Sequence, residues 1–243
     1  MALVTGAGSE RGLGNAIARE LAAAGRSVVL ADVDIEGARR NADAIGGDAR
    51  AVALDVTSEE SVLDAVAAIG RVDILVNNAG ITQRKPIWEL STEDFDRLMG
   101  INLRGGFLCL KAVVAGMMER RWGRVIWISS VAGKQGGGIV GTAHYAASKA
   151  GVIGLCQAAA RELGPYGITS NAIAPGFILT GIATKAVGAD AEKELDAAIS
   201  ASAPVRRSGL PADIANAAVF LASEATSYVT GEVMDVNGGI YFD

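Results

Sequence analysis

Cysteine, histidine and proline are scarce in this sequence, and their scarcity excludes several kinds of site. The 243 residues include two cysteines, one histidine and five prolines. Cys109 and Cys156 each lie in an apolar helical stretch, so we expect buried thiols in a reducing compartment and no disulfide. One histidine and two separated cysteines do not provide the usual ligands of a zinc site. No metal site is predicted.

The sequence also lacks long apolar runs and any excess of positive charge. No uninterrupted apolar stretch reaches about 18 residues, and the first residues lack a signal-peptide pattern. Asp and Glu number 27 against 22 Lys and Arg, which gives a formal net charge of −5. We therefore expect no nucleic-acid partner and no membrane partner. The prediction is a soluble, cytoplasmic protein.

What is present is a globular composition, with 50% apolar and 20% charged residues. Strand-like and helix-like segments alternate, and no linker rich in proline or serine separates them. This alternation predicts an α/β fold with a parallel, doubly wound sheet and a ligand across the carboxyl ends of its strands. We expect a single domain over residues 1–243, in which residues 179–204 form a lid over the substrate.

A glycine-rich turn near the N-terminus is the first motif. Strand 2–4 runs into the segment from Thr5 to Gly14, whose glycines include Gly6 and Gly12, and a helical apolar stripe begins at Leu13. Such glycines let the backbone approach a pyrophosphate, and the helix N-terminus offers N–H groups to it. A tight strand-to-helix turn without a ligand is the alternative.

The second strand, residues 27–31, ends at Asp32, twenty positions after Gly12. An acid there can accept hydrogen bonds from the adenosine ribose hydroxyls and would repel a 2′-phosphate, which favours NAD over NADP. Arg11 points the other way, because a basic residue in the turn could reach a 2′-phosphate. We give Asp32 more weight, since its carboxylate would occupy the position of the phosphate.

Polar residues also follow three later strands. Strand 50–54 leads to Asp55, which could accept from the adenine amino group, serve the start of the next helix, or do both. Strand 74–76 ends in Asn77-Asn78-Ala79-Gly80, where buried amides need partners and small residues let a flat ligand pass. After strand 169–173, Ala174-Pro175-Gly176 is expected to lie outside regular structure.

The pair with catalytic potential is Tyr145 and Lys149. Residues four apart on a helix share one face. A phenol has a pKa of about 10, and a cation about 4 Å away, at an effective dielectric near 20, supplies roughly the 4 kcal/mol that would bring it near 7. Lysine at this spacing could make the tyrosine a proton-transfer group, although most such pairs are ordinary surface contacts.

Two more polar residues, Asn102 and Ser130, lie at positions that suggest a functional role. Residues 91–120 are predicted to be helical, opened by a capping signal at Ser91, and Asn102 falls inside, where asparagine is locally disfavoured. Strand 124–128 ends at Ser130, and a glycine-rich loop over 133–141 returns the chain to Tyr145. Ser130 can therefore face the tyrosine.

Taken together these motifs resemble the short-chain dehydrogenase/reductase family along the whole chain. The resemblance rests on the glycine turn, Asn77-Asn78-Ala79-Gly80, Asn102, Ser130, Tyr145-x-x-x-Lys149 and the segment 171–176. The end of the chain, from Ser227 to Gly239, is similar to the 3-oxoacyl-(acyl carrier protein) reductase branch. The resemblance implies a Rossmann-type sheet of about seven strands in the order 3-2-1-4-5-6-7, and a homotetramer.

The resemblance also implies a role for each matching position. Tyr145 would be the general acid or base, Lys149 would lower its pKa and hold the nicotinamide ribose, Ser130 would orient the substrate, and Asn102 would hold a water of the proton relay. The positions expected to contact the cofactor are Gly6, Ser9, Arg11, Gly12, Leu13, Asp32, Asp55, Val56, Asn78, Ala79, Gly80, Pro175, Gly176, Ile178 and Thr180. The phosphate turn is about two residues longer than the usual form in the family, and the segment from Ser130 to Tyr145 is longer than in the reductase branch.

The function expected from the sequence is NAD(H)-dependent interconversion of a secondary alcohol and a ketone. Arg84, in a basic segment like that of sugar-acid dehydrogenases, could pair with a substrate carboxylate, and Gln135 borders the pocket. A polyol or sugar-acid dehydrogenase is the first hypothesis. The alternatives are a 3-oxoacyl-(acyl carrier protein) reductase using NADPH, a sugar epimerase of the extended branch, and a non-catalytic NAD-sensing protein, against which the joint presence of the four catalytic residues argues.

Overall fold

The computed structural model describes residues 1–138, 141–181, 184 and 188–242. Within them one parallel sheet has the strand order β3-β2-β1-β4-β5-β6-β7. Its strands are β1 (Ala2–Thr5), β2 (Val28–Asp32), β3 (Arg50–Ala53), β4 (Ile74–Asn77), β5 (Gly123–Ile128), β6 (Ile168–Pro175) and β7 (Val233–Val236). The predicted doubly wound sheet and its order are confirmed.

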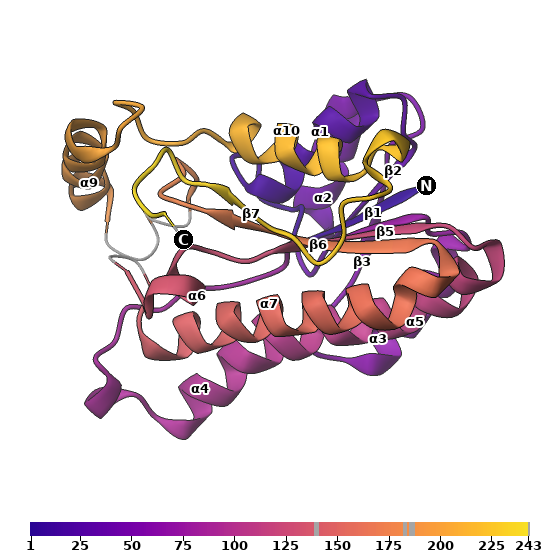
Figure 1. The fold of residues 1–243 in the computed structure, drawn as a ribbon, viewed down its shortest axis with the longest axis horizontal. Helices are drawn as coiled ribbons and strands as arrows, with labels where there is room; N and C mark the ends of the chain where they lie inside the picture. Colours follow the sequence, from indigo (N-terminus) through magenta and orange to yellow (C-terminus); the bar gives the residue numbers. More distant parts are fainter. Residues whose placement is uncertain (139–140, 182–183, 185–187, 243) are drawn as a thin grey trace.

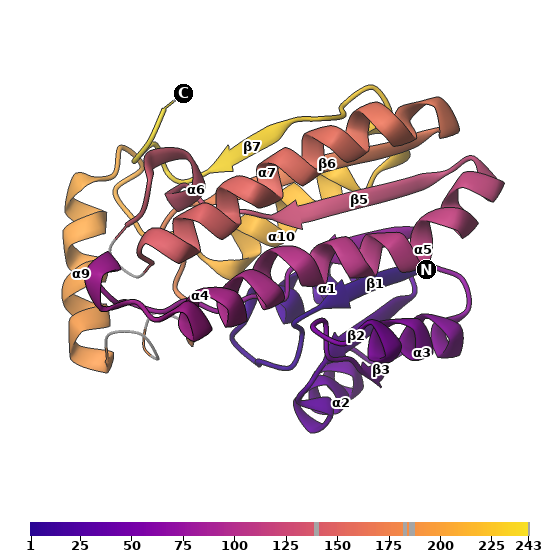
Figure 2. The same cartoon turned by 90° about the horizontal axis from the view of Figure 1, so that it is seen from below.

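Helices cover both faces of this sheet, as Figures 1 and 2 show from two directions. One face carries α1 (Leu13–Ala23), α2 (Ile35–Ile45) and α10 (Pro211–Leu221). The other carries α3 (Glu59–Ile69), α5 (Gly105–Arg120) and α7 (Ala143–Leu163). The shorter helix α4 (Thr92–Met99) continues into α5, while α6 (Ala132–Gln135) and α9 (Ala189–Ser202) lie beyond the carboxyl ends of the strands.

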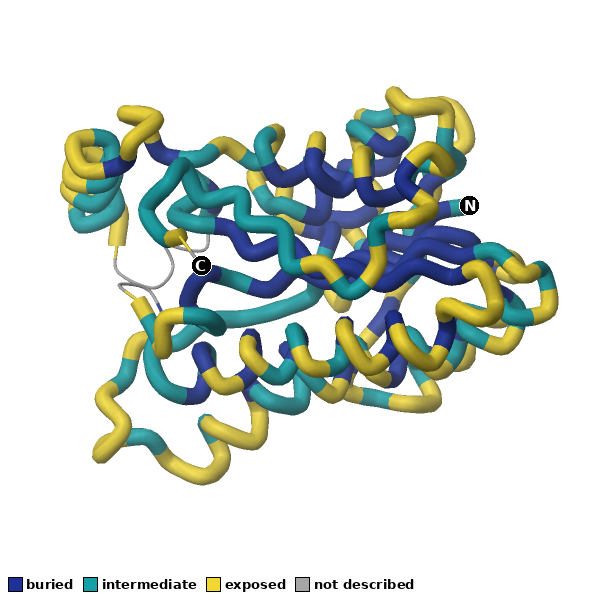
Figure 3. The backbone as a smooth tube through the Cα atoms, viewed as in Figure 1, coloured by how far each residue is buried: buried dark blue, intermediate teal, exposed yellow. Residues whose placement is uncertain are grey.

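The central strands β1, β2 and β4 are mostly apolar because both faces of the sheet are covered. Successive side chains alternate between the two layers: Leu3 packs in one hydrophobic core, whereas Ala2 and Val4 pack in the other. Figure 3 shows the central strands as the most continuously buried part of the chain. The sheet is thus a rigid base whose carboxyl edge can hold polar groups in fixed positions.

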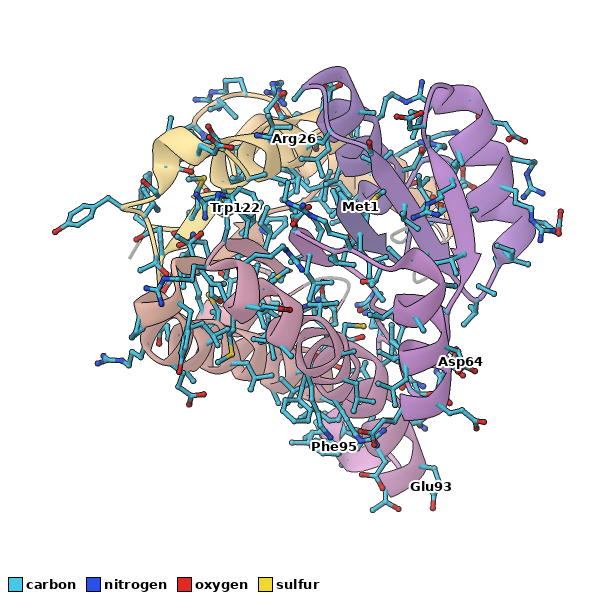
Figure 4. The ribbon with its side chains drawn as sticks, turned by 90° about the vertical axis from the view of Figure 1, so that its right-hand side faces the viewer. Met1, Arg26, Asp64, Glu93, Phe95 and Trp122 are labelled. Carbon is cyan, nitrogen blue, oxygen red and sulfur yellow. The ribbon has the colours of Figure 1, made fainter. Side chains whose placement is uncertain are left out.

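The two ends of the sheet have different roles. Figure 4 faces the amino end and labels Met1, Arg26 and Trp122, which lead into β1, β2 and β5. At the opposite end lie the carboxyl termini of the strands, and most of the expected site residues follow them, whereas Asn102 lies in a helical turn and Tyr145 and Lys149 lie on α7. The fold therefore gathers them at one edge.

The stretch predicted as one helix over residues 91–120 contains a π-helical turn, η2 (Gly100–Arg104), between α4 and α5. The Ser91 hydroxyl caps its start by accepting the Asp94 N–H at 3.1 Å. By length and composition Thr92–Arg120 could span a membrane, a test that core helices of soluble proteins also pass. Leu108, Cys109 and Met117 of this helix are buried in the core against the sheet.

Two local predictions were wrong. Ala174 and Pro175 belong to β6. Proline has no N–H to donate, but at the last position of a strand its carbonyl alone can make the hydrogen bond, and it accepts the Val131 N–H at 3.1 Å. The segment predicted as a loop over 133–141 begins inside the short helix α6, and positions 139–140 lie outside the described residues.

Two further predictions concern the lid and the cysteines. Of the predicted lid 179–204, positions 182–183 and 185–187 lie outside the described residues, and α9 buries none of its own residues. Cys109 and Cys156 are buried free thiols, as expected. Burial raises the pKa of Cys109 to about 12 and that of Cys156 to about 11.

Candidate active site

The glycine-rich turn after β1 forms a tight cradle at the N-terminus of α1. Gly6 has a positive φ of 67°, and a Cβ there would lie 2.7 Å from the Ala79 Cα. A Cβ on Gly14 would lie 2.5 Å from the Gly6 carbonyl oxygen. Gly12 caps α1 without a side-chain hydrogen bond, so first-turn N–H groups remain available to an anion. These features fit a dinucleotide phosphate.

The extra length of this turn is closed by local hydrogen bonds. The Gly12 N–H donates to the Ser9 carbonyl at 3.1 Å, and the buried Asn15 amide donates to the Glu10 carbonyl at 2.7 Å. Ser9 and Arg11 are exposed on the outside of the turn, and Leu13 opens α1. Asn15 was not identified from the sequence, because its partner depends on the shape of the turn.

Asp32 lies at the end of β2 and is tied to the same turn. Its Oδ2 accepts the Gly8 N–H at 2.7 Å and its Oδ1 accepts the Asp34 N–H at 3.0 Å. A Cβ on Gly8 would lie 2.8 Å from the Asp32 carboxyl carbon. Each carboxylate oxygen can accept a further hydrogen bond, so the geometry is compatible with the ribose role expected from the sequence.

The Asn77–Gly80 segment is cross-linked to the turn through Thr5. The Thr5 hydroxyl accepts the N–H groups of Asn78 and Ala79, at 3.1 and 3.0 Å, and donates to the Val76 carbonyl. The Asn78 side chain donates to the carbonyls of Thr5 and Gly6. The Asn78 side chain thus links the end of β4 to the end of β1, and the small residues Ala79 and Gly80 follow it.

Asp55 and Val56 follow β3 on the adenine side of the expected site. Asp55 Oδ1 accepts from the Thr57 N–H at 2.9 Å and from its hydroxyl at 2.7 Å, while Ser58 caps α3. Asp55 is exposed and Val56 is buried. The turn-forming role of Asp55 at the start of α3 is therefore present, and a second hydrogen bond to adenine is compatible with it.

The catalytic pair lies on the first turns of α7, and Ser130 follows β5. The Lys149 Nζ is 5.7 Å from the centroid of the Tyr145 ring, so the two share one helix face as predicted. Burial raises the pKa of Tyr145, and a hydrogen bond with Ser130 opposes that rise. Ser130 thus faces the phenol. Gly141 packs directly on the Tyr145 ring, where a larger side chain would collide.

Lys149 is 5% exposed, and its Nζ donates to the Ile128 carbonyl at 2.8 Å. Burial lowers its pKa to about 8. An ammonium has three donors, so two are left for a ribose or a water. Burial thus raises the pKa of Tyr145 and lowers that of Lys149, which is opposite to the lowered tyrosine pKa expected from the sequence.

Asn102 lies in the π-helical turn, and its side-chain amide makes hydrogen bonds through both its oxygen and its nitrogen. Its Oδ1 accepts the Ile81 N–H at 2.8 Å, and its Nδ2 donates to the Ile81 carbonyl at 2.9 Å and to Ser148 Oγ at 3.1 Å. A π-bulge often marks a functional site. Because Oδ1 can accept a second hydrogen bond, a water of the proton relay could bind at Oδ1 or at the main-chain carbonyl of Asn102.

The residues expected near the nicotinamide follow β6. Pro175 ends the strand, and Gly176 is pressed against Asn237, whose Cα a Cβ would approach to 2.8 Å. Ile178 forms an isolated bridge with Gly209, and Thr180 is 6% exposed. These four positions lie along one wall, next to the end of β7.

Of the two residues expected to contact the substrate, Arg84 is exposed at the site, whereas Gln135 already has a hydrogen-bond partner in its own loop. Arg84 is exposed in the loop after β4. Gln135 is exposed and donates to the Gly137 carbonyl within its own loop. Two other cations of this region are paired, Lys85 with Asp94 at 2.8 Å and Lys134 with Asp235 at 2.7 Å.

Chemically, this edge can hold a dinucleotide and move one proton. The cradle fits the phosphates, Asp32 fits a ribose, and the hydroxyls of Ser130 and Tyr145 lie together beside a buried ammonium. When bound, a nicotinamide supplies the acceptor or donor of a hydride. Among the described residues no cluster of three His, Cys, Asp or Glu side chains could hold a metal ion.

Comparison with known proteins agrees with this geometry. A family model described as enoyl-(acyl carrier protein) reductase matches residues 6–241. The 3-oxoacyl-(acyl-carrier-protein) reductase of Escherichia coli strain K12 is 45% identical over 245 residues, covering 99% of this chain and 97% of the relative. The enzyme of the same description from Aquifex aeolicus is 40% identical, with the same coverage.

Solved structures give the same fold with two kinds of description. A candidate gluconate dehydrogenase from Agrobacterium tumefaciens matches with a TM-score of 0.91 and 38% identity, covering 99% of this chain and 95% of that one. A 3-oxoacyl-(acyl-carrier protein) reductase from Brucella melitensis with bound NAD matches with a TM-score of 0.90 and 34% identity, covering 100% and 91%.

Both the motifs and these full-length matches point to one assignment. The chain is an NAD(P)-dependent oxidoreductase acting on CH–OH groups, which sets aside the non-catalytic alternative. It belongs to the short-chain dehydrogenase/reductase family and resembles the 3-oxoacyl-(acyl carrier protein) reductase branch.

Proposed function

We propose that the protein interconverts a 3-oxoacyl thioester and the corresponding 3-hydroxyacyl thioester, with NAD(H) as the cofactor. The observation that carries the substrate class is the 40–45% identity, over 99% of the chain, to several reductases of that description. From the sequence alone a polyol or sugar-acid substrate stood first. The relatives reverse that order.

In the proposed mechanism Tyr145 is the proton-transfer group. In reduction its hydroxyl donates a proton to the carbonyl oxygen of the substrate, and in oxidation the tyrosinate takes the proton of the hydroxyl. Ser130 orients the same oxygen by a hydrogen bond. In oxidation the proton then passes from Tyr145 toward Lys149 and a water held at the Asn102 carbonyl, and in reduction the same groups return a proton to Tyr145.

The charge of Lys149 supports the tyrosinate form. The ammonium lies 5.7 Å from the centroid of the Tyr145 ring, where its positive charge favours the ionised phenol over the neutral one. This opposes the rise in the Tyr145 pKa that burial causes. Lys149 also provides two N–H donors for the nicotinamide ribose, while Asn78, Ala79 and Gly80 line the passage to it.

Replacing Tyr145 by Phe is expected to lower turnover by about 10²–10⁴-fold, because only the proton donor is removed. Steady-state rates and a cofactor titration measure the two effects, and the dissociation constant for NADH should stay within about threefold of the wild-type value. Tyr166→Phe, at a half-exposed tyrosine after α7, is the matched control. Near wild-type turnover of Tyr145→Phe would remove Tyr145 from the mechanism.

The cofactor preference is expected to follow Asp32. Wild-type enzyme should prefer NADH over NADPH by about tenfold or more in kcat/KM, since the carboxylate would repel a 2′-phosphate. Asp32→Asn keeps an acceptor for the Gly8 N–H but removes the charge, so it should narrow the preference mainly by improving NADPH. A tenfold preference of the wild type for NADPH contradicts the argument and would favour Arg11 as the deciding residue.

A sugar-acid dehydrogenase is the second candidate. It is supported by the exposed guanidinium of Arg84 beside the site, which can bind a carboxylate through two parallel hydrogen bonds. The likeness to a candidate gluconate dehydrogenase, at 38% identity, agrees with it. The longer segment between Ser130 and Tyr145 gives a reason for a pocket shaped differently from that of the reductases.

A substrate panel separates these candidates. We expect acetoacetyl-coenzyme A to be reduced with a kcat/KM at least tenfold above that of any keto-sugar acid or ketose, and Arg84→Ala to change that value by less than about twofold. If a sugar acid is instead the better substrate, Arg84→Ala should raise its KM by about tenfold or more. Arg19→Ala, at an exposed arginine of α1, controls for the loss of a surface charge.

We also propose a homotetramer in which α4, α5 and α7 form one interface. An apolar hollow on this face is lined by Met99, Leu103, Phe107, Gly151 and Leu155, and Phe107 is 45% exposed. An exposed apolar hollow bordered by charged residues is typical of an interface. The edge strand β7, half-exposed along its length, offers a second one.

Phe107→Arg is expected to dissociate the tetramer, because it buries a charge at the centre of that interface. Sedimentation velocity at micromolar concentration measures the effect. Leu63→Arg on α3, where the leucine is 53% exposed, is the control and should stay tetrameric. A monomeric wild type contradicts the proposal.

The lid and the cellular location are part of the same proposal. Residues 179–204 leave β6 beside the nicotinamide wall, and α9 has no buried residue that would hold it against the body, which supports a substrate lid. The two buried free thiols support a reducing, cytoplasmic location.

A further inference from the structure

A chain of four polar side chains surrounds the loop that follows β4, and we name it the loop clamp: His144, Gln83, Asp94 and Lys85. His144 Nε2 lies 3.0 Å from Gln83 Oε1. Gln83 Nε2 donates to Asp94 Oδ1 at 3.0 Å, and Lys85 Nζ donates to Asp94 Oδ2 at 2.8 Å. His144 directly precedes Tyr145 on α7, and Asp94 lies on α4.

The direction of every hydrogen bond in the loop clamp follows from its ionised end. The pKa of Asp94 is lowered to about 2 by hydrogen bonds from Lys85 and Gln83, so it is a carboxylate and can only accept. The Gln83 amide must then turn its NH₂ toward Asp94 and its oxygen toward His144. His144 consequently donates from Nε2, which makes the Nε2–H tautomer the neutral form.

Within the part of the chain that the structure describes, the other ring nitrogen of His144 has no hydrogen-bond partner. Nδ1 is buried without a hydrogen bond, and the side chain is 0% exposed. A second proton would therefore be buried without an acceptor, at a cost. The charged groups that face the ring are Asp94 and Arg97 from α4 and Lys85 from the loop. Burial, with Arg97 and Lys85, lowers the His144 pKa, and Asp94 opposes this.

The loop clamp holds the later part of residues 81–86, and Asn102 of the candidate active site holds the beginning of the same segment. Ile81 is held through both of its main-chain polar groups by Asn102. Four residues on, the Thr142 hydroxyl donates to the Lys85 carbonyl at 2.7 Å, next to the start of α7. In Figure 1 this segment runs from β4 toward α4 past the beginning of α7. Gln83 and Lys85 point inward, and Arg84 between them is exposed.

We infer that His144 is a positioning residue for the reaction: as the neutral Nε2–H tautomer it holds residues 81–86 in place beside Tyr145, and its protonation releases them. No chemical step passes through His144 itself. It acts on the substrate side of the pocket through Gln83. The inference rests on the proposed role of Tyr145, whose helix turn it shares.

The pH profile of ketone reduction separates this role from a merely structural one. In reduction Tyr145 must be protonated, so acid does not inhibit it and an acid limb can come from His144. With NADH and the fastest ketone of the substrate panel, we expect wild-type kcat/KM to be level near pH 7, where Lys149 with its pKa of about 8 is still charged, and to fall below about pH 6.5. Asp94 stays ionised over this range.

Two matched variants test the residue. Gln places a non-titrating N–H donor near the Nε2 position, so His144→Gln should recover the rate at pH 7 to within about threefold and lose the acid limb. Asn is too short to reach Gln83, so His144→Asn should lose about tenfold in kcat/KM at every pH, the usual size of a broken buried hydrogen bond. Gln83→Leu cuts the same link from the other side and should match His144→Asn.

Hydrogen exchange of the ligand-free enzyme gives a second readout that needs no activity. Peptides covering 81–86 should exchange faster in His144→Asn and Gln83→Leu, and as in wild type in His144→Gln at pH 8. An acid limb that persists in His144→Gln, or wild-type rates and exchange in His144→Asn, would overturn the inference. If no ketone is reduced even by wild type, the proposed function fails, while exchange still tests the loop clamp.

Discussion

The catalytic edge of this protein depends on a cation that has almost no contact with water. Lys149 is 5% exposed, and the Ile128 carbonyl is its hydrogen-bond partner at 2.8 Å. Its pKa, lowered to about 8 by burial, shows that the lost solvation is only partly replaced. A bound ribose would restore two hydrogen bonds, so in the proposed function the ammonium would both assist proton transfer and favour cofactor binding.

Small residues make the burial of this lysine possible. A Cβ on Gly80 would lie 3.5 Å from Nζ, and one on Gly133 would lie 2.7 Å from the Lys149 carbonyl carbon. Ser129 then secures the helix by donating to the Lys149 carbonyl at 2.9 Å. The strand ends of β4 and β5 therefore approach α7 closely enough to exclude water, and Tyr145 and Ser130 are brought together by the same approach.

The loop after β4 joins the catalytic residues to the substrate side of the pocket. Asn102 holds its beginning through Ile81, and Asp94 and Thr142 hold its end at Lys85. Functions differ among proteins of one fold through such surroundings, whereas the proton-transfer chemistry is shared. This is why the position of Tyr145 and Lys149 identifies a reaction class, while the substrate depends on a loop of few residues with its own anchors.

The doubly wound sheet, most of its strand ends and the reaction class could be predicted from the sequence. Apolar runs alternating with helical stripes predict a doubly wound sheet, and motif residues at strand ends, such as Asp32 and Ser130, are local in sequence. The end of β6 at Pro175 and the π-helical turn at Asn102 were missed, because both depend on what packs beside them.

Only the folded structure shows which polar side chains already have hydrogen-bond or ion-pair partners. Spacing along the chain shows neither that the Asn102 amide is used by Ile81 nor that Lys85 is neutralised by Asp94. Hydrogen-bond partners and burial are set by segments distant in sequence, as Gln83 and His144 are, so only the folded chain can assign the polar groups their roles.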